Sequence, residues 1–133
     1  MVRINIIPVE ELTDQHLRAE YVEILMLCQG LKRTLNSKNG FVKERVPERY
    51  TLNTGHMYFF YNKGKYLRKR FLLVKREMVA RGFNPVKTFP RSVWTNNLWK
   101  DWKPNKGDFE IIKERIKQKI ALKPKWYKKT QRT

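Results

Sequence analysis

The sequence predicts an all-α fold: a single compact domain of about three helices joined by long irregular loops. Apolar residues recur at three- and four-residue spacings in three segments, which is the period of a helix face. Prolines and glycines gather between those segments, as loop residues do. The length of 133 residues, 41% of them hydrophobic, supports one domain with a real core and is too short for two. We therefore treat residues 1–133 as one domain.

The first predicted helix runs from about Thr13 to about Leu35. Thr13 or Asp14 can cap its start with a side-chain oxygen. One face of this segment carries the apolar residues Leu17, Ile24, Leu25, Cys28, Leu31 and Leu35. The turn sequence at residues 36–40 ends the helix. Residues 41–62 read as loop with short extended pieces, and the aromatic run at residues 58–61 is typical of core.

The second predicted helix runs from about Lys63 to Arg81. Its apolar stripe is formed by Leu67, Phe71, Val74 and Met78. Gly82 suits the position after a helix end, and a proline follows at position 85. The third helix begins near Asp108 and ends before Pro124. Its stripe is formed by Phe109, Ile112, Ile116 and Ile120.

Two other segments differ in character. Residues 85–107 form an irregular loop that carries Trp94, Trp99 and Trp102 among basic residues. These tryptophans could form a wedge or stacking surface for a ligand, or the loop could pack on the core. Residues 123–133 form a basic tail with an aromatic pair.

The charge of the chain is large and unevenly placed. There are 30 Lys and Arg against 12 Asp and Glu, a net charge of +18. Residues 1–60 hold 8 basic and 7 acidic residues, whereas residues 61–133 hold 22 and 5. A polyanionic partner is expected, with nucleic acid first. The acids of the first half are then candidates for chemistry on a bound polyanion, or they are solvated helix-face residues.

Several classes of protein are excluded by what the sequence lacks. A single cysteine, Cys28, permits no internal disulfide and no cysteine-rich zinc site, and it fits a reducing, intracellular compartment. His16 and His56 are too few to suggest a metal site. No apolar run reaches the length of a membrane span, no secretory signal is expected, and no glycine-rich phosphate loop is present.

Separated motifs occur in a fixed order along the chain. They are Arg3-Ile4-Asn5, Asp14-Gln15-His16-Leu17, Ala19-Glu20-Tyr21 with Glu23, Gly55-His56, Phe59-Phe60-Tyr61, Leu67-Arg68-Lys69-Arg70, Arg81-Gly82-Phe83-Asn84, Arg115, Lys119-Ile120-Ala121, Pro124 and Trp126-Tyr127-Lys128. In these motifs the chain resembles the small pyrimidine dimer DNA glycosylases with AP lyase activity, of the phage endonuclease V type. Residues 1–84 align without gaps, whereas residues 85–110 do not match the family closely.

The resemblance implies a reaction without metal or cofactor. The nucleophile would be the α-amino group of Val2, exposed when Met1 is removed. Such an amine has a pKa near 7.7–8.0, so roughly 10–15% is unprotonated at pH 7. It would attack C1′, displace the base and form a Schiff base, after which loss of a C2′ proton allows β-elimination. Glu23 matches the family's catalytic carboxylate.

The same resemblance implies a set of residues that bind damaged double-stranded DNA. They are Arg3, Gln15, His16, Arg68, Arg70, Arg115, Lys119, Trp126, Tyr127 and Lys128. His16 could instead cap the helix or lie in the core, and core packing is the alternative for both rings of the tail. A monomer and a microbial or viral source are also implied. On charge alone a basic membrane-surface protein is the lesser alternative, so no membrane partner is expected.

The sequence departs from the family at three positions near the site. Val22 and Met26 stand where arginines flank the catalytic carboxylate, and Phe71 replaces a glutamine. Loss of the arginines should weaken lesion binding and raise the pKa of a buried Glu23. Three functions therefore remain open: a glycosylase for pyrimidine dimers, the same chemistry on abasic sites or another altered base, and a basic nucleic-acid-binding protein without catalysis.

Overall fold

The computed structural model of the chain describes residues 2–133, so the expected removal of Met1 falls outside the described residues. Over this range the fold is all-helical, with no strand. It contains the helices α1 (Asp14–Leu35), α2 (His56–Phe60), α3 (Gly64–Ala80) and α4 (Lys106–Leu122), with short 3₁₀ turns between them. The predicted fold class is confirmed, and the three long helices end within two residues of their expected limits.

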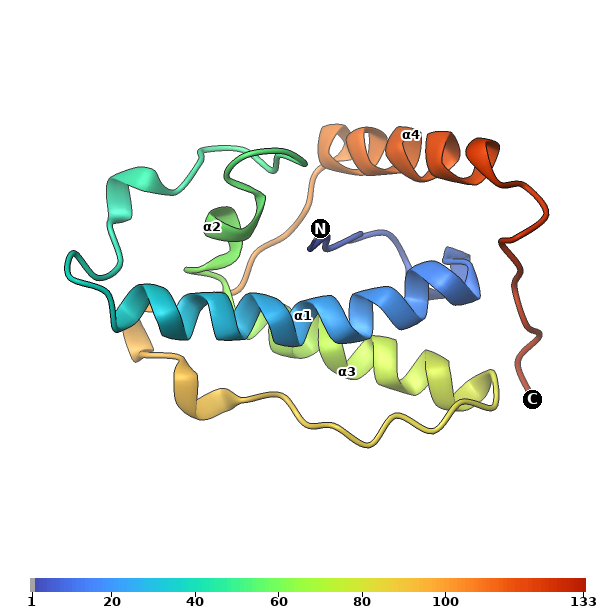
Figure 1. Cartoon of the computed structure of the whole chain (residues 1–133), viewed down its shortest axis with the longest axis horizontal. Coiled ribbons are helices and arrows are strands. Elements are labelled where there is room, and N and C mark those ends of the chain that lie inside the picture. The colour runs from blue at the N-terminus through green and yellow to red at the C-terminus, as the bar shows by residue number, and fades with distance from the viewer. Residues whose placement is uncertain (1) are drawn as a thin grey trace.

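The core lies between α1 and α3, which pack side by side (Figure 1). The apolar stripes expected for both helices meet there: Leu17, Ile24, Leu31, Leu67, Phe71 and Val74 are all fully buried. Thr13 caps α1, since its hydroxyl oxygen accepts a hydrogen bond from the amide of His16 at 3.1 Å. Burial of these side chains is the main force that holds α1 against α3.

The prediction of a loop over residues 41–62 is wrong at its end, where the short helix α2 forms. Gly55 has a φ of +96°, in the left-handed region that favours glycine, and it turns the chain into α2. Phe59 and Phe60 are buried, as the aromatic run predicts. A five-residue helix is too short to be stable alone, so tertiary packing of these two rings stabilises it.

Helix α4 crosses the fold on the other side of the N-terminal segment from α1 in Figure 1. A capping box starts it: the Asn105 side chain accepts from the Asp108 amide at 2.9 Å, and the Asp108 carboxylate accepts from the Asn105 amide. Asp108 is therefore part of the cap, and the helix begins two residues earlier than expected. Ile112 is its one fully buried residue.

The divergent loop, residues 85–107, packs on the core. Trp94 is 3% exposed, and Trp102 stacks on Tyr50 with ring centroids 6.1 Å apart. Phe89 lies between Phe71 of α3 and Trp94. The core-packing alternative holds for Trp94, whereas Trp99 and Trp102 pack against the core and stay partly exposed. Nowhere in residues 2–133 does a helix have the length and apolarity needed to cross a membrane.

Candidate active site

The N-terminal arm, residues 2–7, has no strand partner among the described residues, so side chains bind its backbone. The Ile4 amide donates to Nε2 of His56 at 2.9 Å, and the Ile4 carbonyl accepts from the Tyr50 hydroxyl at 2.7 Å. His56 Nδ1 is then the nitrogen that donates to the Thr51 carbonyl, at 2.6 Å. The imidazole is neutral in this arrangement, and burial lowers its pKa.

A buried ion pair fixes the next part of the arm. Arg70 of α3 and Glu20 of α1 are 4% and 0% exposed, and Arg70 Nε lies 2.5 Å from Glu20 Oε2. Glu20 also accepts from the Asn5 amide at 3.1 Å, and Arg70 donates to the Ile7 carbonyl. Ile6, between them, has a φ of +49°, a conformation that costs a β-branched residue energy. The pair therefore holds a strained bend in the arm.

The carboxylate of Glu23 is tied to the start of the arm. Its Oε1 accepts from the Arg3 amide at 2.6 Å. Since Arg3 directly follows Val2, this bond places the carboxylate one residue from the Val2 backbone. Val2 is only 9% exposed. Burial raises the pKa of Glu23, although the hydrogen bond from Arg3 opposes the shift.

Most of the residues that the resemblance implies line one cavity of about 220 Å³. The N-terminal arm, the start of α1, the end of α4 and the C-terminal tail form its walls. The lining residues are Arg3, Asn5, Gln15, His16, Ala19, Glu23, Lys119, Trp126 and Tyr127. Val2 lines a neighbouring pocket of about 820 Å³, with residues of the loop before α2 and of α2 itself.

The cavity is electropositive around a single carboxylate. Among the residues that the structure describes, Glu23 is the only acid that lines it, whereas Arg3 and Lys119 contribute positive charge. Burial, and then the nearby Arg115, lower the pKa of Arg3, and burial with the charge of Arg3 also lowers the pKa of His16. An anion such as a phosphate would relieve this repulsion between cations.

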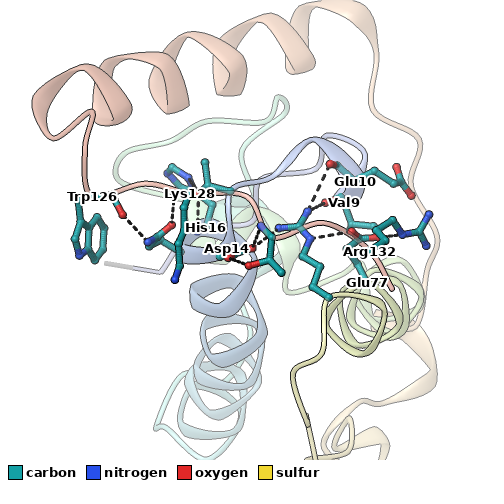
Figure 2. Close-up of polar contacts among 12 residues, drawn as sticks. Val9, Glu10, Asp14, His16, Glu77, Trp126, Lys128 and Arg132 are labelled. Atoms are coloured by element: carbon teal, nitrogen blue, oxygen red, sulfur yellow. Dashed lines mark hydrogen bonds and ion pairs between the residues drawn. The ribbon is translucent and has the colours of Figure 1, made fainter.

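His16 and Gln15 have partners within the protein as well as a place in the cavity. The His16 ring stacks on Tyr127 at 4.8 Å between centroids, and its Nδ1 lies 2.7 Å from the Thr13 hydroxyl. His16 thus contacts the residue that caps α1 and also lines the cavity. Gln15 binds the backbone of the tail at Trp126 and Lys128 (Figure 2).

The remaining implied DNA contacts lie outside the cavity lining. Arg115 is on α4, and its Nε is buried with no hydrogen-bond partner among residues 2–133. Arg68 and Lys128 are exposed. The prediction that Arg70 contacts DNA is wrong, because its guanidinium is buried and already bound to Glu20 and a backbone carbonyl.

The three departures from the family pattern have different structural settings. Val22 and Met26 lie on the open face of α1, 47% and 49% exposed. Phe71 is fully buried and stacks on Tyr21, with ring centroids 5.4 Å apart. It belongs to the core that the divergent loop covers through Phe89. Only Val22 and Met26 can therefore change what the surface beside Glu23 binds.

Comparison with protein families supports one of the functions left open by the sequence. Residues 1–90, more than half of the chain, match the family model described as pyrimidine dimer DNA glycosylase. The chain belongs to the pyrimidine dimer DNA glycosylase family. Its membership supports a DNA-repair glycosylase with DNA as substrate. The matched region contains α1, α2, α3 and the N-terminal arm, and it ends inside the divergent loop.

The candidate site includes residues whose roles the sequence did not reveal. Asn5 lines the cavity, is 3% exposed, and its Oδ1 has no hydrogen-bond partner among the described residues. Tyr50 and His56 position the arm. Glu20 could have been recognised, because it falls three residues after Leu17 and so lies within the buried stripe of α1. In the part of the chain described, no group of three or more His, Cys, Asp or Glu could hold a metal ion.

Proposed function

We propose that this protein is a DNA glycosylase and AP lyase for pyrimidine dimers, with the α-amine of Val2 as nucleophile and Glu23 as its assisting carboxylate. The proposal includes removal of Met1 and a monomer that acts inside the cell on double-stranded DNA. The observation that carries it is the hydrogen bond from the Arg3 amide to Glu23, at 2.6 Å. That bond keeps a carboxylate beside the first residue of the processed chain.

The reaction follows from these two groups. The amine lone pair attacks C1′, and the damaged base leaves with the electrons of the glycosidic bond and takes up a proton. The attacking nitrogen loses one proton, and the sugar ring opens as O4′ takes the electrons of the C1′–O4′ bond and a proton, which gives a protonated imine between Val2 and C1′. A base then removes a C2′ proton, and the 3′ phosphate leaves by β-elimination, which cleaves the strand. Water finally hydrolyses the imine and frees the amine.

Glu23 is suited to more than one of these steps. Its carboxylate stabilises the positive charge that develops on the sugar and on the imine. Half-burial raises its pKa, and a general acid or base works best when its pKa is near the pH of the reaction. Arg3, Lys119 and Arg115 supply the positive charge that attracts the phosphates beside the lesion.

A second candidate is the same chemistry on abasic sites or another altered base. Val22 and Met26 favour it, since exposed apolar side chains replace the arginines that the family has at these positions, and their loss should weaken binding of a pyrimidine dimer. A basic binding protein without catalysis is the third. It would bind with strong salt dependence and without preference for damage.

The test compares strand cleavage of two labelled duplexes, one with a thymine dimer and one with an abasic site. The wild type should cleave both, and Glu23→Gln should lose about 10²–10⁴-fold in rate while its DNA affinity is retained. Glu110→Gln, on the exposed surface of α4, makes the same change in charge and should cleave normally. Cleavage of the abasic duplex alone would select the second candidate, and unchanged cleavage by Glu23→Gln would refute the proposal.

A further inference from the structure

The C-terminal tail, residues 123–133, contributes two rings to the cavity although it forms no helix beyond the end of α4. Trp126 and Tyr127 line the cavity. Figure 2 shows that this segment runs across the start of α1. Its rings can form a wall of the cavity only if the backbone that carries them is fixed to the rest of the protein.

Gln15 binds the backbone on both sides of Tyr127. Its Nε2 donates to the Trp126 carbonyl at 2.7 Å, and its Oε1 accepts from the Lys128 amide at 3.1 Å. The two ends of one side-chain amide thus bracket the residue whose ring stacks on His16, with the ring planes within 6° of parallel. Bracketing sets the direction in which the Tyr127 ring points.

Asp14 attaches the tail to the core a short distance further along. Its amide donates to the Lys128 carbonyl at 2.7 Å, and its carboxylate accepts from the amide of Thr130 at 3.0 Å and from the Thr130 hydroxyl. The same carboxylate is paired with Arg81 at 3.0 Å. Burial alone would raise the pKa of Asp14, but the hydrogen bonds from Thr130 and Arg81 outweigh it and lower the pKa.

Arg81 connects this attachment to the centre of the protein. It is 3% exposed, pairs with Glu77 at 2.8 Å, and donates to the Val9 carbonyl at 3.2 Å (Figure 2). A buried charge network of this kind keeps its geometry because breaking one member leaves another unpaired. Asp14 therefore presents a fixed acceptor to a tail that is otherwise exposed.

We propose that Asp14 and Gln15 are positioning residues that fix the tail as a wall of the active-site cavity, with Thr130 as the tail's anchor. The inference rests on the proposed function for its effect on DNA. Glu23 and the N-terminal arm are held by other side chains, so release of the tail leaves the amine and its carboxylate in place. Loss of the anchor should weaken binding of a bulky lesion and spare the imine-forming step on an abasic site.

The first experiment measures hydrogen exchange of the tail amides, which requires no activity. Gln15→Met should speed exchange at the Lys128 amide about fivefold or more. Thr130→Val should do the same at the backbone amide of position 130. Gln118→Met is the matched control, because Gln118 is exposed on α4 and its side-chain amide donates to Glu114 at 3.4 Å, away from the tail. Unchanged exchange in both tail variants would overturn the proposal whether or not the protein is an enzyme.

The second experiment separates positioning from direct DNA contact. Thr130→Val should raise the dissociation constant for a thymine-dimer duplex about fivefold or more, and Thr130→Ser, which keeps the hydroxyl, should restore it. The rate of borohydride trapping on an abasic duplex should change less than twofold in both variants. An equal loss on both duplexes, or faster exchange with unchanged binding, would overturn the positioning role. Absence of trapping by the wild type would refute the proposed function but leave the exchange result intact.

Discussion

The N-terminal arm and the C-terminal tail are held in place by different kinds of side chain. Neither the N-terminal arm nor the C-terminal tail pairs with a strand, yet each must place a group in one cavity. The arm is bound by buried partners, among them Glu20, Tyr50 and Arg70. The tail is exposed and depends on Gln15 and on two buried carboxylates, Asp14 and Glu77. The difference matches their roles, since the arm would carry the nucleophile and the tail a wall.

The arm should therefore be more sensitive than the tail to loss of a hydrogen-bond partner. The backbone groups of the arm are out of water, so removal of a partner leaves a buried polar group unsatisfied. Water can replace most partners of the tail. Substitutions at the arm should therefore lower the free energy of unfolding more than substitutions at the tail, apart from those that reach the buried network behind Asp14.

The largest expected effect is that of Arg70→Met. It leaves the Glu20 carboxylate buried without its charge partner and removes the bond to the Ile7 carbonyl, at a cost of about 3–5 kcal/mol in the free energy of unfolding. Urea denaturation measures it. Lys69→Met is the control on the same helix: its ion pair with Asp101 is about half exposed and should cost under about 1 kcal/mol. Equal losses would contradict the comparison.

Tyr50→Phe should have the next largest effect. The change removes the hydroxyl that donates to the Ile4 carbonyl and should lower the free energy of unfolding by about 1–3 kcal/mol. The rate of borohydride trapping should fall as well, because the arm carries Val2. Tyr58→Phe removes the hydroxyl that accepts from the Val42 amide, away from the arm, and should leave trapping unchanged. A slow Tyr58→Phe variant would show that the effect is not specific to the arm.

The pH dependence of stability should distinguish His56, which binds the arm, from His16, which stacks on the tail. Burial lowers the folded-state pKa of His56, with the charges of Arg3 and Glu20 acting in opposite directions. Between that pKa and about 6.5, the unfolded chain binds a proton that the folded chain does not, so stability falls as the pH drops below about 6.5. His56→Gln should flatten this slope by up to about 1.4 kcal/mol per pH unit.

His16→Gln is the matched variant for that measurement. Burial lowers the pKa of His16 too, so its slope has the same sign, but this ring is half-exposed against Tyr127. Its contribution should be smaller. Glu23 acts in the opposite direction above about pH 4.5, where its raised pKa makes the folded chain bind the extra proton. A larger slope change in His16→Gln than in His56→Gln would contradict the prediction that His56 contributes more to the pH dependence of stability.

The smallest effect is expected for Arg132→Ala at the end of the tail. Arg132 is 56% exposed and pairs with Glu77, which keeps its buried partner Arg81. The free energy of unfolding should fall by less than about 1 kcal/mol, measured by urea denaturation. A loss as large as that of Arg70→Met would mean that the tail is as tightly held as the arm.

The sequence predicted the helices well because their signal is local. The stripe at Leu67, Phe71 and Val74 is a helix face whatever packs against it. Arg70 lies on that same face, three residues after Leu67, but the family resemblance placed it among the DNA-binding residues. Its burial depends on Glu20, which is 50 positions away in the chain. No local pattern contains such a pairing.

The candidate site was predictable to the extent that it resembles a family. Arg3, Gln15, His16, Glu23, Lys119 and the tail rings are brought together as the motifs imply. The supports of the site were not predicted. His56 and Tyr50 reach the arm across about fifty residues, and Gln15 reaches the tail across more than a hundred, so only the fold reveals them.

The most direct test of the proposed nucleophile is to trap the protein on an abasic duplex with borohydride. Mass spectrometry of the peptides then identifies the modified residue. If Val2 is the nucleophile, one adduct should form, on the α-amine of Val2, in a chain that has lost Met1. Its yield should fall in Glu23→Gln and not in Glu110→Gln. An adduct on a lysine, or no adduct from a chain with a free Val2 amine, would contradict this prediction.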